Sequence, residues 1–315
     1  MRKLSALLSA VCFMGLLTLA ASPAVFAQGD QKLDPATERK VYDTLNACIA
    51  EKDNIKKLAM AQEALKLYPK SQYVPYLKDQ VSQARGSLLQ QAMQEGKTED
   101  AFKLAADVLN EEPENLNYLL TLADFSARLA KGPKADYSFA DKGTEYAKKA
   151  VELINNGKRP VGLDEAQWNT RKGAVLASMH QAVGLFLLKA KKDEDALNAL
   201  SESAKQDCSD PVTHYLIAQI HNNKYEALSA EYNQLPDDKK SSDDGKAILD
   251  KINPVIDQML EAYGKMMAVS DGKANYDALR NRVKPSMEEL YKFRHEGKSD
   301  GLPAFIDGFK SSCTK

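Results

Sequence analysis

Apolar side chains recur at three- and four-residue spacing through most of the chain, and no segment alternates apolar and polar residues as a half-buried strand would. One stretch near the C-terminus places its apolar residues on a single helical stripe, namely Val255, Ile256, Met259, Leu260, Tyr263, Met266 and Met267. Glycine and proline are sparse and fall between such stretches, as at Gly132, Pro133 and Gly162. The pattern predicts an all-α fold.

A shorter pattern recurs within that periodicity. A small or apolar residue is followed three positions later by another, and a break comes five positions after that. The sets are Ala61, Ala64 and Pro69; Ala105, Val108 and Pro113; Ala147, Ala150 and Asn155; and Leu200, Ser203 and Cys208. Small side chains allow two helices to approach closely, and a proline or polar turn ends a helix and redirects the chain. We therefore predict a series of helical hairpins.

Two segments, residues 82–115 and 177–210, resemble tetratricopeptide repeats in the placement of their small and apolar residues, and each is, by that count, 34 residues long, which is the length of that family's repeat. The matching positions are His180, Val183, Gly184, Leu187, Ala196 and Leu200 in the second, and Leu88, Leu89, Ala92, Ala101, Ala105 and Pro113 in the first. In that pattern Gly184 is the small residue where the two helices of a repeat cross. The resemblance covers residues 36–222 and implies an α-solenoid of helical hairpins. Successive breaks are 44, 42 and 53 residues apart, so we expect first helices longer than the family norm.

The remainder of the chain does not follow the repeat. Residues 28–35 are a short extension, and the polar segment 223–245 is predicted to be a linker loop with at most one short helix at 225–232. The region 246–315 is predicted to be helical and to cap the end of the array. Its two prolines, Pro254 and Pro285, each mark either a helix start or a kink, and its tail should dock through the apolar residues Leu302, Phe305, Ile306 and Phe309.

The first 27 residues have the organisation of a secretory signal peptide. Arg2 and Lys3 precede an apolar stretch that ends before Pro23, and small residues lead up to Ala27. The alternative is an N-terminal membrane anchor, for which the apolar stretch is short. Cleavage after Ala27 would leave a chain with no further segment approaching the ~20 apolar residues of a membrane helix. We therefore expect a protein exported across the inner membrane into the periplasm.

The net charge of the chain indicates which class of partner it can bind. The chain has 43 basic and 44 acidic residues, and loss of the signal peptide would remove two positive charges and no negative one, taking the net charge from −1 to −3. A nucleic-acid partner would call for a basic stripe. The near-neutral balance argues against that class of partner.

The sequence contains no recognisable catalytic or metal-binding motif. The histidines are His180, His214, His221 and His295, and they lack the spacing of a zinc site. Neither a G-x-S-x-G nucleophile turn nor a glycine-rich phosphate loop occurs. We predict no catalytic residue, metal or cofactor, and hence a protein that is not an enzyme.

Three cysteines remain in the expected mature chain: Cys48, Cys208 and Cys313. They permit at most one intramolecular disulfide in an oxidising compartment, and Cys208 with Cys313 is the candidate pair because both lie in the C-terminal half. The alternative is that all three are buried small apolar side chains.

The tetratricopeptide resemblance implies a concave groove, built by first helices, that holds an extended peptide or a helix of a partner protein. The residues it places in that groove are Tyr42, Asn46, Gln90, Gln94, Gln181 and Lys189. Their polar, amide-rich character suits hydrogen bonding to a peptide backbone. The predicted function is that of a protein-interaction scaffold or adaptor in the cell envelope. The alternative is an envelope-acting enzyme or an accessory subunit of an enzyme complex.

Overall fold

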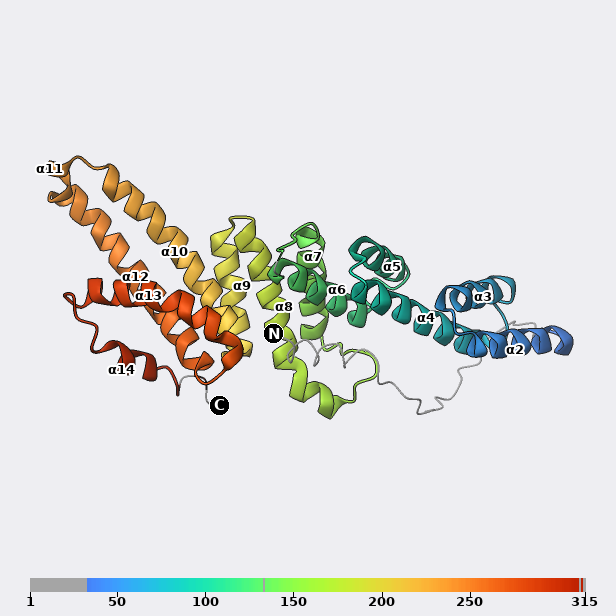
Figure 1. Ribbon diagram of the computed structural model, residues 1–315. Helices are drawn as coiled ribbons and strands as arrows, with labels where there is room; N and C mark the ends of the chain where they lie inside the picture. The colour runs from blue at the N-terminus through green and yellow to red at the C-terminus, as the bar shows by residue number, and fades with distance from the viewer. Residues whose placement is uncertain (1–32, 133, 312, 314–315) are drawn as a thin grey trace. The chain divides into compact units, whose positions relative to one another are not determined.

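The computed structural model describes residues 33–132, 134–311 and 313, and these residues form helices and connecting turns without any strand (Figure 1). The prediction of an all-α fold is confirmed. The predicted signal peptide lies outside the described residues. None of the described helices combines the length and apolar character needed to cross a membrane.

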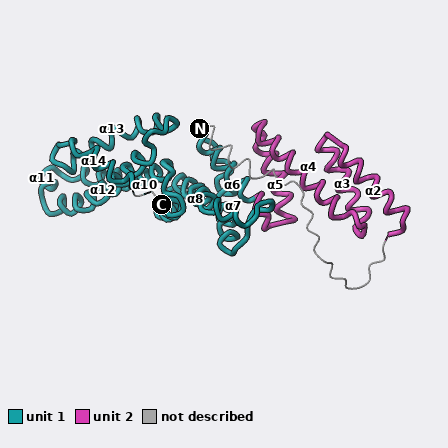
Figure 2. Tube along the Cα trace, turned by 90° about the horizontal axis from the view of Figure 1, so that it is seen from below, with its two compact units in different colours: residues 1–15, 119–315 teal, residues 16–118 magenta. Residues whose placement is uncertain are grey.

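The chain divides into two compact units, which are described separately (Figure 2). The described part of the smaller unit ends at Tyr118. Its helices are α2 (Pro35–Ala50), α3 (Asn54–Leu67), α4 (Val74–Gln94) and α5 (Thr98–Glu111). Aspartates begin the first two: Asp34 accepts hydrogen bonds from the amides of Ala36 and Thr37 at 3.0 Å, and Asp53 accepts one from Ile55 at 2.9 Å. These caps satisfy amides that a helix start leaves unpaired.

The larger unit begins at Leu119, within α6. Its helices are α6 (Leu116–Lys131), α7 (Ala140–Asn155), α8 (Glu165–Lys189), α9 (Asp193–Gln206), α10 (Pro211–Gln234), α11 (Asp237–Lys240), α12 (Asp243–Ser270), α13 (Asp277–Arg294) and α14 (Leu302–Asp307), with a short 3-10 turn at Ala274–Tyr276. Successive helices pack against each other as hairpins, for example α8 with α9 and α10 with α12. The expectation of long first helices holds for α4, α8 and α10, which have 21, 25 and 24 residues.

The recurring small residues are the packing surfaces of the second helices. All eight are buried: Ala61, Ala64, Ala105, Val108, Ala147, Ala150, Leu200 and Ser203. Each helix that carries a pair ends at or just before the predicted break, as α3 does before Pro69 and α5 before Pro113. The crossing at Gly184 is equally close, because a Cβ atom there would lie 2.5 Å from Cγ of Leu200. These features of the hairpin prediction are confirmed.

The segment at 223–245 differs from the prediction. It is not a loop, because α10 continues to Gln234 and α12 begins at Asp243, with only α11 and short turns between them. The physical reason lies in Tyr225, Leu228 and Tyr232, which share one face of α10 and pack against the core formed with α12. Polar residues on the opposite face of α10 gave the segment the composition of a loop, so the apolar stripe was not recognised in the sequence. Pro254 and Pro285 both lie inside helices, in α12 and α13.

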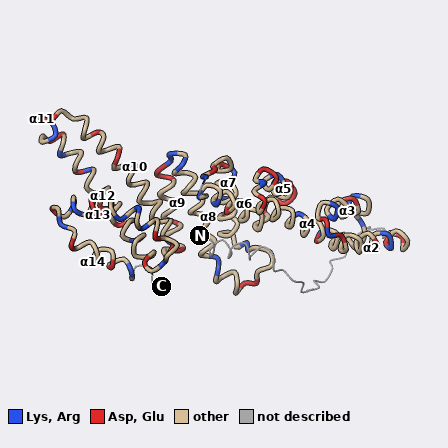
Figure 3. Tube along the Cα trace, in the orientation of Figure 1, with Lys and Arg blue, Asp and Glu red and all other residues tan. Residues whose placement is uncertain are grey.

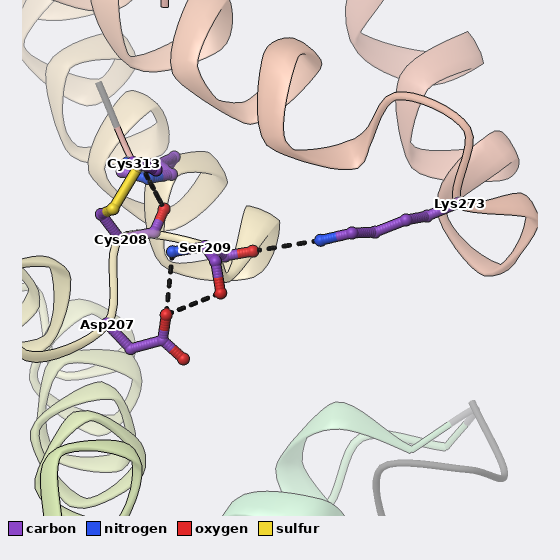
Figure 4. The surroundings of a disulfide bond; sticks show 6 residues. Asp207, Cys208, Ser209, Lys273 and Cys313 are labelled. Carbon is purple, nitrogen blue, oxygen red and sulfur yellow. Dashed lines mark hydrogen bonds between the residues drawn. A yellow bond between two sulfur atoms is a disulfide. The ribbon is translucent and has the colours of Figure 1, made fainter. Parts of the chain in front are cut away.

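The C-terminal tail docks as predicted. Leu302 is buried, and Phe305 and Ile306 pack against the core of α12 and α13. The ring of Phe309 occupies the space that a side chain at Gly264 would need, since a Cβ atom there would lie 2.6 Å from it. A disulfide between Cys208 and Cys313 then joins the tail to the turn between α9 and α10 (Figure 4). Cys48 is a buried free thiol.

An ion pair joins α4 to α5 in the smaller unit. The guanidinium of Arg85, a buried residue, donates two hydrogen bonds to the carboxylate of Glu111, at 2.8 and 2.7 Å. We expect Glu111→Gln to lower the free energy of unfolding by about 1 kcal/mol at neutral pH, because Arg85 keeps a weaker partner while Glu111 itself is largely exposed. Urea unfolding followed by circular dichroism measures this, with Glu63→Gln on the exposed face of α3 as the control.

The same pair gives a pH dependence with a definite sign. The hydrogen bonds from Arg85 hold the pKa of Glu111 below its usual value of 4.5. A depressed folded-state pKa adds stability above about pH 4.5, and that stability is lost as the pH falls through the folded value. The difference between the unchanged protein and Glu111→Gln should therefore shrink in acid. A difference that grows below pH 4.5 would contradict this assignment.

Candidate protein-binding surface

Helix α2 buries one face and exposes the other. Val41, Leu45 and Cys48 pack into the core of the smaller unit against residues of α3 and α4. Tyr42, 42% exposed, and Ile49, 56% exposed, lie on the outward face. Large apolar side chains left in contact with water on one helix face are unusual enough to mark an interaction surface when they adjoin others.

The turn before α4 carries a second tyrosine to this face. The hydroxyl of Ser71 donates to the carboxylate of Glu38 on α2 at 2.7 Å, and the amide of Gln72 donates to the same carboxylate at 3.2 Å. The amide of Tyr73 in turn donates to the Ser71 hydroxyl at 3.2 Å. Because Ser71 is buried, these bonds fix the turn against α2 and set the direction of the Tyr73 side chain.

Three tyrosine rings form the resulting cluster. The ring centroids of Tyr42 and Tyr73 are 5.4 Å apart, and those of Tyr73 and Tyr76 are 6.5 Å apart, both pairs with tilted planes. Tyr76 is 49% exposed. Tilted pairs at these separations are mutually stabilising. The cluster is therefore a preformed aromatic surface; we refer to Tyr42, Tyr73 and Tyr76 as the tyrosine cluster.

A stripe of uncharged polar residues continues from the tyrosine cluster along α4. Its members recur every three or four positions and so share one face of the helix: Tyr76, Gln80, Gln83, Ser87, Gln90 and Gln94. Gln80 is buried, whereas Gln83, Gln90 and Gln94 are exposed. Each glutamine amide offers two donors and an acceptor, so we refer to this set as the amide stripe.

Four of the six residues predicted from the sequence belong to this region. Tyr42 and Asn46 lie on the exposed face of α2, and Gln90 and Gln94 lie in the amide stripe. The prediction missed Tyr73 and Tyr76, although their three-residue spacing at the start of α4 and the regular spacing of the glutamines were both readable in the sequence.

The other two predicted residues lie in α8, in the larger unit, and their side chains contact other residues of that unit. Gln181 is only 6% exposed, and its amide donates to the hydroxyl of Thr213 at 2.8 Å and to the carboxylate of Asp210. Its carbonyl accepts from the ammonium of Lys131. These bonds leave Gln181 no free polar group for a partner, so its burial argues against a groove role. Lys189 is exposed, with its ammonium 4.8 Å from the ring centroid of Tyr137.

The groups around Gln181 form a structural network that joins α6, α8 and α10. Desolvation lowers the pKa of Lys131, against the opposing influence of Asp210 and Asp124. Although Lys131 as a residue keeps much of its surface in solvent, its ammonium end is enclosed by these partners. Desolvation likewise raises the pKa of Asp124, while Arg128 at 2.9 Å opposes the shift. Opposite charges thus compensate within the network.

The distribution of charged side chains and of metal-ligating side chains bears on what the protein could bind. Lysines, arginines and carboxylates are interspersed along the helices of both units (Figure 3). Among the described residues, no group of three histidines, cysteines or carboxylates is arranged to hold a metal ion. No protein-family model matches the chain, and no curated protein is significantly similar to it.

Proposed function

We propose that this protein is an exported helical-repeat scaffold or adaptor of the cell envelope, which binds an extended peptide segment of another protein. The observation that carries the proposal is the tyrosine cluster, half-exposed and fixed in place by the Glu38–Ser71 hydrogen bonds. Tyrosine is enriched at binding hot spots because it offers a large contact area at a low entropic cost. The repeat architecture, an α-solenoid similar to tetratricopeptide proteins, is part of the same proposal.

The chemistry of the surface indicates the kind of segment it would hold. The tyrosine cluster and the amide stripe carry no formal charge. A strongly charged peptide would lose its hydration on such a surface without gaining an ion pair. A segment with apolar or aromatic anchors for the tyrosines, and free backbone groups for the glutamines, is better matched.

Photo-crosslinking in cells that express the full chain tests the proposal. We expect a photoreactive phenylalanine analogue at Tyr42 or at Gln90 to capture the same protein. The matched control is Gln62, an exposed glutamine on α3 outside the surface, which should not capture it. Since tyrosine hot spots each contribute about 2 kcal/mol or more, Tyr42→Ala together with Tyr76→Ala should reduce capture at Gln90 at least tenfold.

Two outcomes would overturn the proposal. One is capture of the same proteins with equal yield at Gln62 and Gln90, which would indicate that the surface has no selectivity. The other is turnover of an envelope substrate by the purified chain alone, which would favour the enzyme alternative. Export is checked separately by N-terminal sequencing of the mature protein, which we expect to begin at Gln28.

A further inference from the structure

A pocket of about 410 Å³ lies in the larger unit, between α9, α10 and α12. Short connections make these three helices alternate in direction, and each contributes residues from one face over two turns. The lining therefore forms three successive levels: Ala204, His214 and Lys265; Ser201, Ile217 and Ala262; and Leu197, His221 and Gln258. This pocket shares no residue with the tyrosine cluster or the amide stripe.

The two ends of the pocket differ. Cys208 and Cys313, which form the disulfide, line the pocket beside His214, and the Nε2 atom of that histidine is already hydrogen-bonded to the carbonyl of Cys208 at 2.8 Å. The middle level is largely apolar. The remaining polar group of interest is His221, at the far end.

His221 is 9% exposed, yet its ring makes no hydrogen bond to any residue that the structure describes. Gln258, which lines the same level, is exposed, so its amide can bond to water. The ring nitrogens of His221 are not fully enclosed, because among the described residues the fully buried side-chain atom without a hydrogen bond is Oδ1 of Asp193. A ring nitrogen that lines a pocket and has no protein partner can hydrogen-bond to a ligand or to water. Burial lowers the pKa of His221, and Lys224 acts in the same direction against Glu261. The imidazole is therefore neutral at pH 7, with one donor and one acceptor nitrogen.

The charged groups at the rim are already paired. The ammonium of Lys265 lies 2.6 Å from the carboxylate of Glu261, and that of Lys205 lies 2.5 Å from Glu202. An anionic ligand would have to compete with these carboxylates, and a cationic ligand with these lysines. The lining thus favours an uncharged ligand.

We propose that this pocket binds a small uncharged molecule with an apolar body and a hydroxyl group, which hydrogen-bonds to the imidazole of His221. A hydroxyl can donate and accept at once and so matches a neutral imidazole. The apolar body would lie along Leu197, Ile217 and Ala262. The volume lies within the roughly 300–1,000 Å³ that small-molecule sites occupy.

Three probes that share one ring test the proposal on the full-length oxidised protein: toluene, p-cresol and p-toluate. Binding is measured by calorimetry and by the histidine ring resonances in NMR. We expect p-cresol to bind saturably and to shift the resonance that His221→Leu removes. We also expect p-cresol to bind more tightly than the carboxylate. In His221→Leu the ratio of the p-cresol to the toluene association constant should fall about tenfold, which corresponds to one lost hydrogen bond.

Two further variants separate recognition from general damage to the fold. His221→Gln keeps a donor and an acceptor and should restore part of the ratio. His180→Gln, on α8 outside the pocket, should leave it unchanged. Failure of p-cresol to saturate the unchanged protein, tighter binding of p-toluate, or an unchanged ratio in His221→Leu would each overturn the proposal.

Discussion

Cys208→Ser and Cys313→Ser are each expected to lower the free energy of unfolding by about 2–4 kcal/mol relative to the oxidised protein. The bond joins residues that are 105 positions apart and so closes a long loop. Chain-entropy arguments give roughly 4–5 kcal/mol for a loop of that size, and measured effects are usually smaller. The double variant should be no less stable than either single one, because all three lose the same bond.

The contacts that remain explain why the tail should stay partly docked after reduction. Lys310 pairs with Asp271 at 3.0 Å, and the ring of Phe309 packs at Gly264. Next to the disulfide, the ammonium of Lys273 donates to the carbonyl of Ser209 at 3.4 Å, which holds the turn that carries Cys208 without involving the tail (Figure 4). The loss should therefore appear as reduced stability and not as a loss of helix.

Guanidinium unfolding with and without a thiol reductant measures the effect. The only tryptophan in the sequence, Trp168, is buried in α8 of the same unit, so its fluorescence reports on that unit alone. Reduction of the unchanged protein should reproduce the value found for the double variant. An unfolding midpoint that reduction does not move would show that the disulfide contributes nothing to stability.

The helices and their close crossings could be predicted because they depend on local spacing. Small or apolar residues three positions apart, as at Ala105 and Val108, indicate where two helices pack closely. The breaks that follow them mark where each helix ends. The close crossing at Gly184 was implied instead by the resemblance to tetratricopeptide repeats. The docking of the tail was also predictable, since four apolar residues on one face must be covered.

What the sequence concealed depends on contacts between distant segments. Helix α10 continues because Tyr225 and Tyr232 pack against α12. The polar composition of the segment had instead led to the prediction of a loop. The burial of Gln181 follows from Asp210 and Thr213, about 30 positions away. Burial by residues so distant in sequence cannot be derived from helical periodicity, because periodicity specifies which face of a helix is apolar but not which segment covers it.

The binding surfaces show the same limit. Tyr73 joins the tyrosine cluster because Glu38 and Ser71 hold the turn, a contact between α2 and residues more than thirty positions later. His221 stood out in the sequence only as one of four histidines. Its lack of a hydrogen bond, which makes it informative, can be recognised only once its neighbours are placed.

Gly184→Ala is expected to lower the free energy of unfolding by about 1–3 kcal/mol, the usual result of overpacking a core. A Cβ atom at this position would lie 2.5 and 2.8 Å from Cγ and Cδ2 of Leu200, and 3.3 Å from the carbonyl oxygen of Ala196. Leu200 is fully buried, and the carbonyl belongs to the backbone of α9, so neither can move without separating α8 from α9. This penalty should exceed the roughly 1 kcal/mol that alanine gains over glycine in a helix.

Gly173, eleven residues earlier in the same helix, provides the matched control. A Cβ atom there would meet only the carbonyl oxygen of Gln206, at an ordinary contact distance of 3.5 Å. Gly173→Ala should therefore raise stability by up to about 1 kcal/mol through helix propensity alone. Unfolding followed at Trp168 compares the two variants under identical conditions, and equal effects of the two would refute the close crossing.

A double-mutant cycle identifies the atoms responsible. Leu200→Ala alone should cost about 2–5 kcal/mol, because it leaves a cavity. Combined with Gly184→Ala it should cost less than the sum of the two, since the shortened side chain makes room for the new methyl group. Strict additivity would place the strain elsewhere, at the carbonyl of Ala196, and would mean that the backbones of α8 and α9, and not the leucine side chain, set how closely these helices approach.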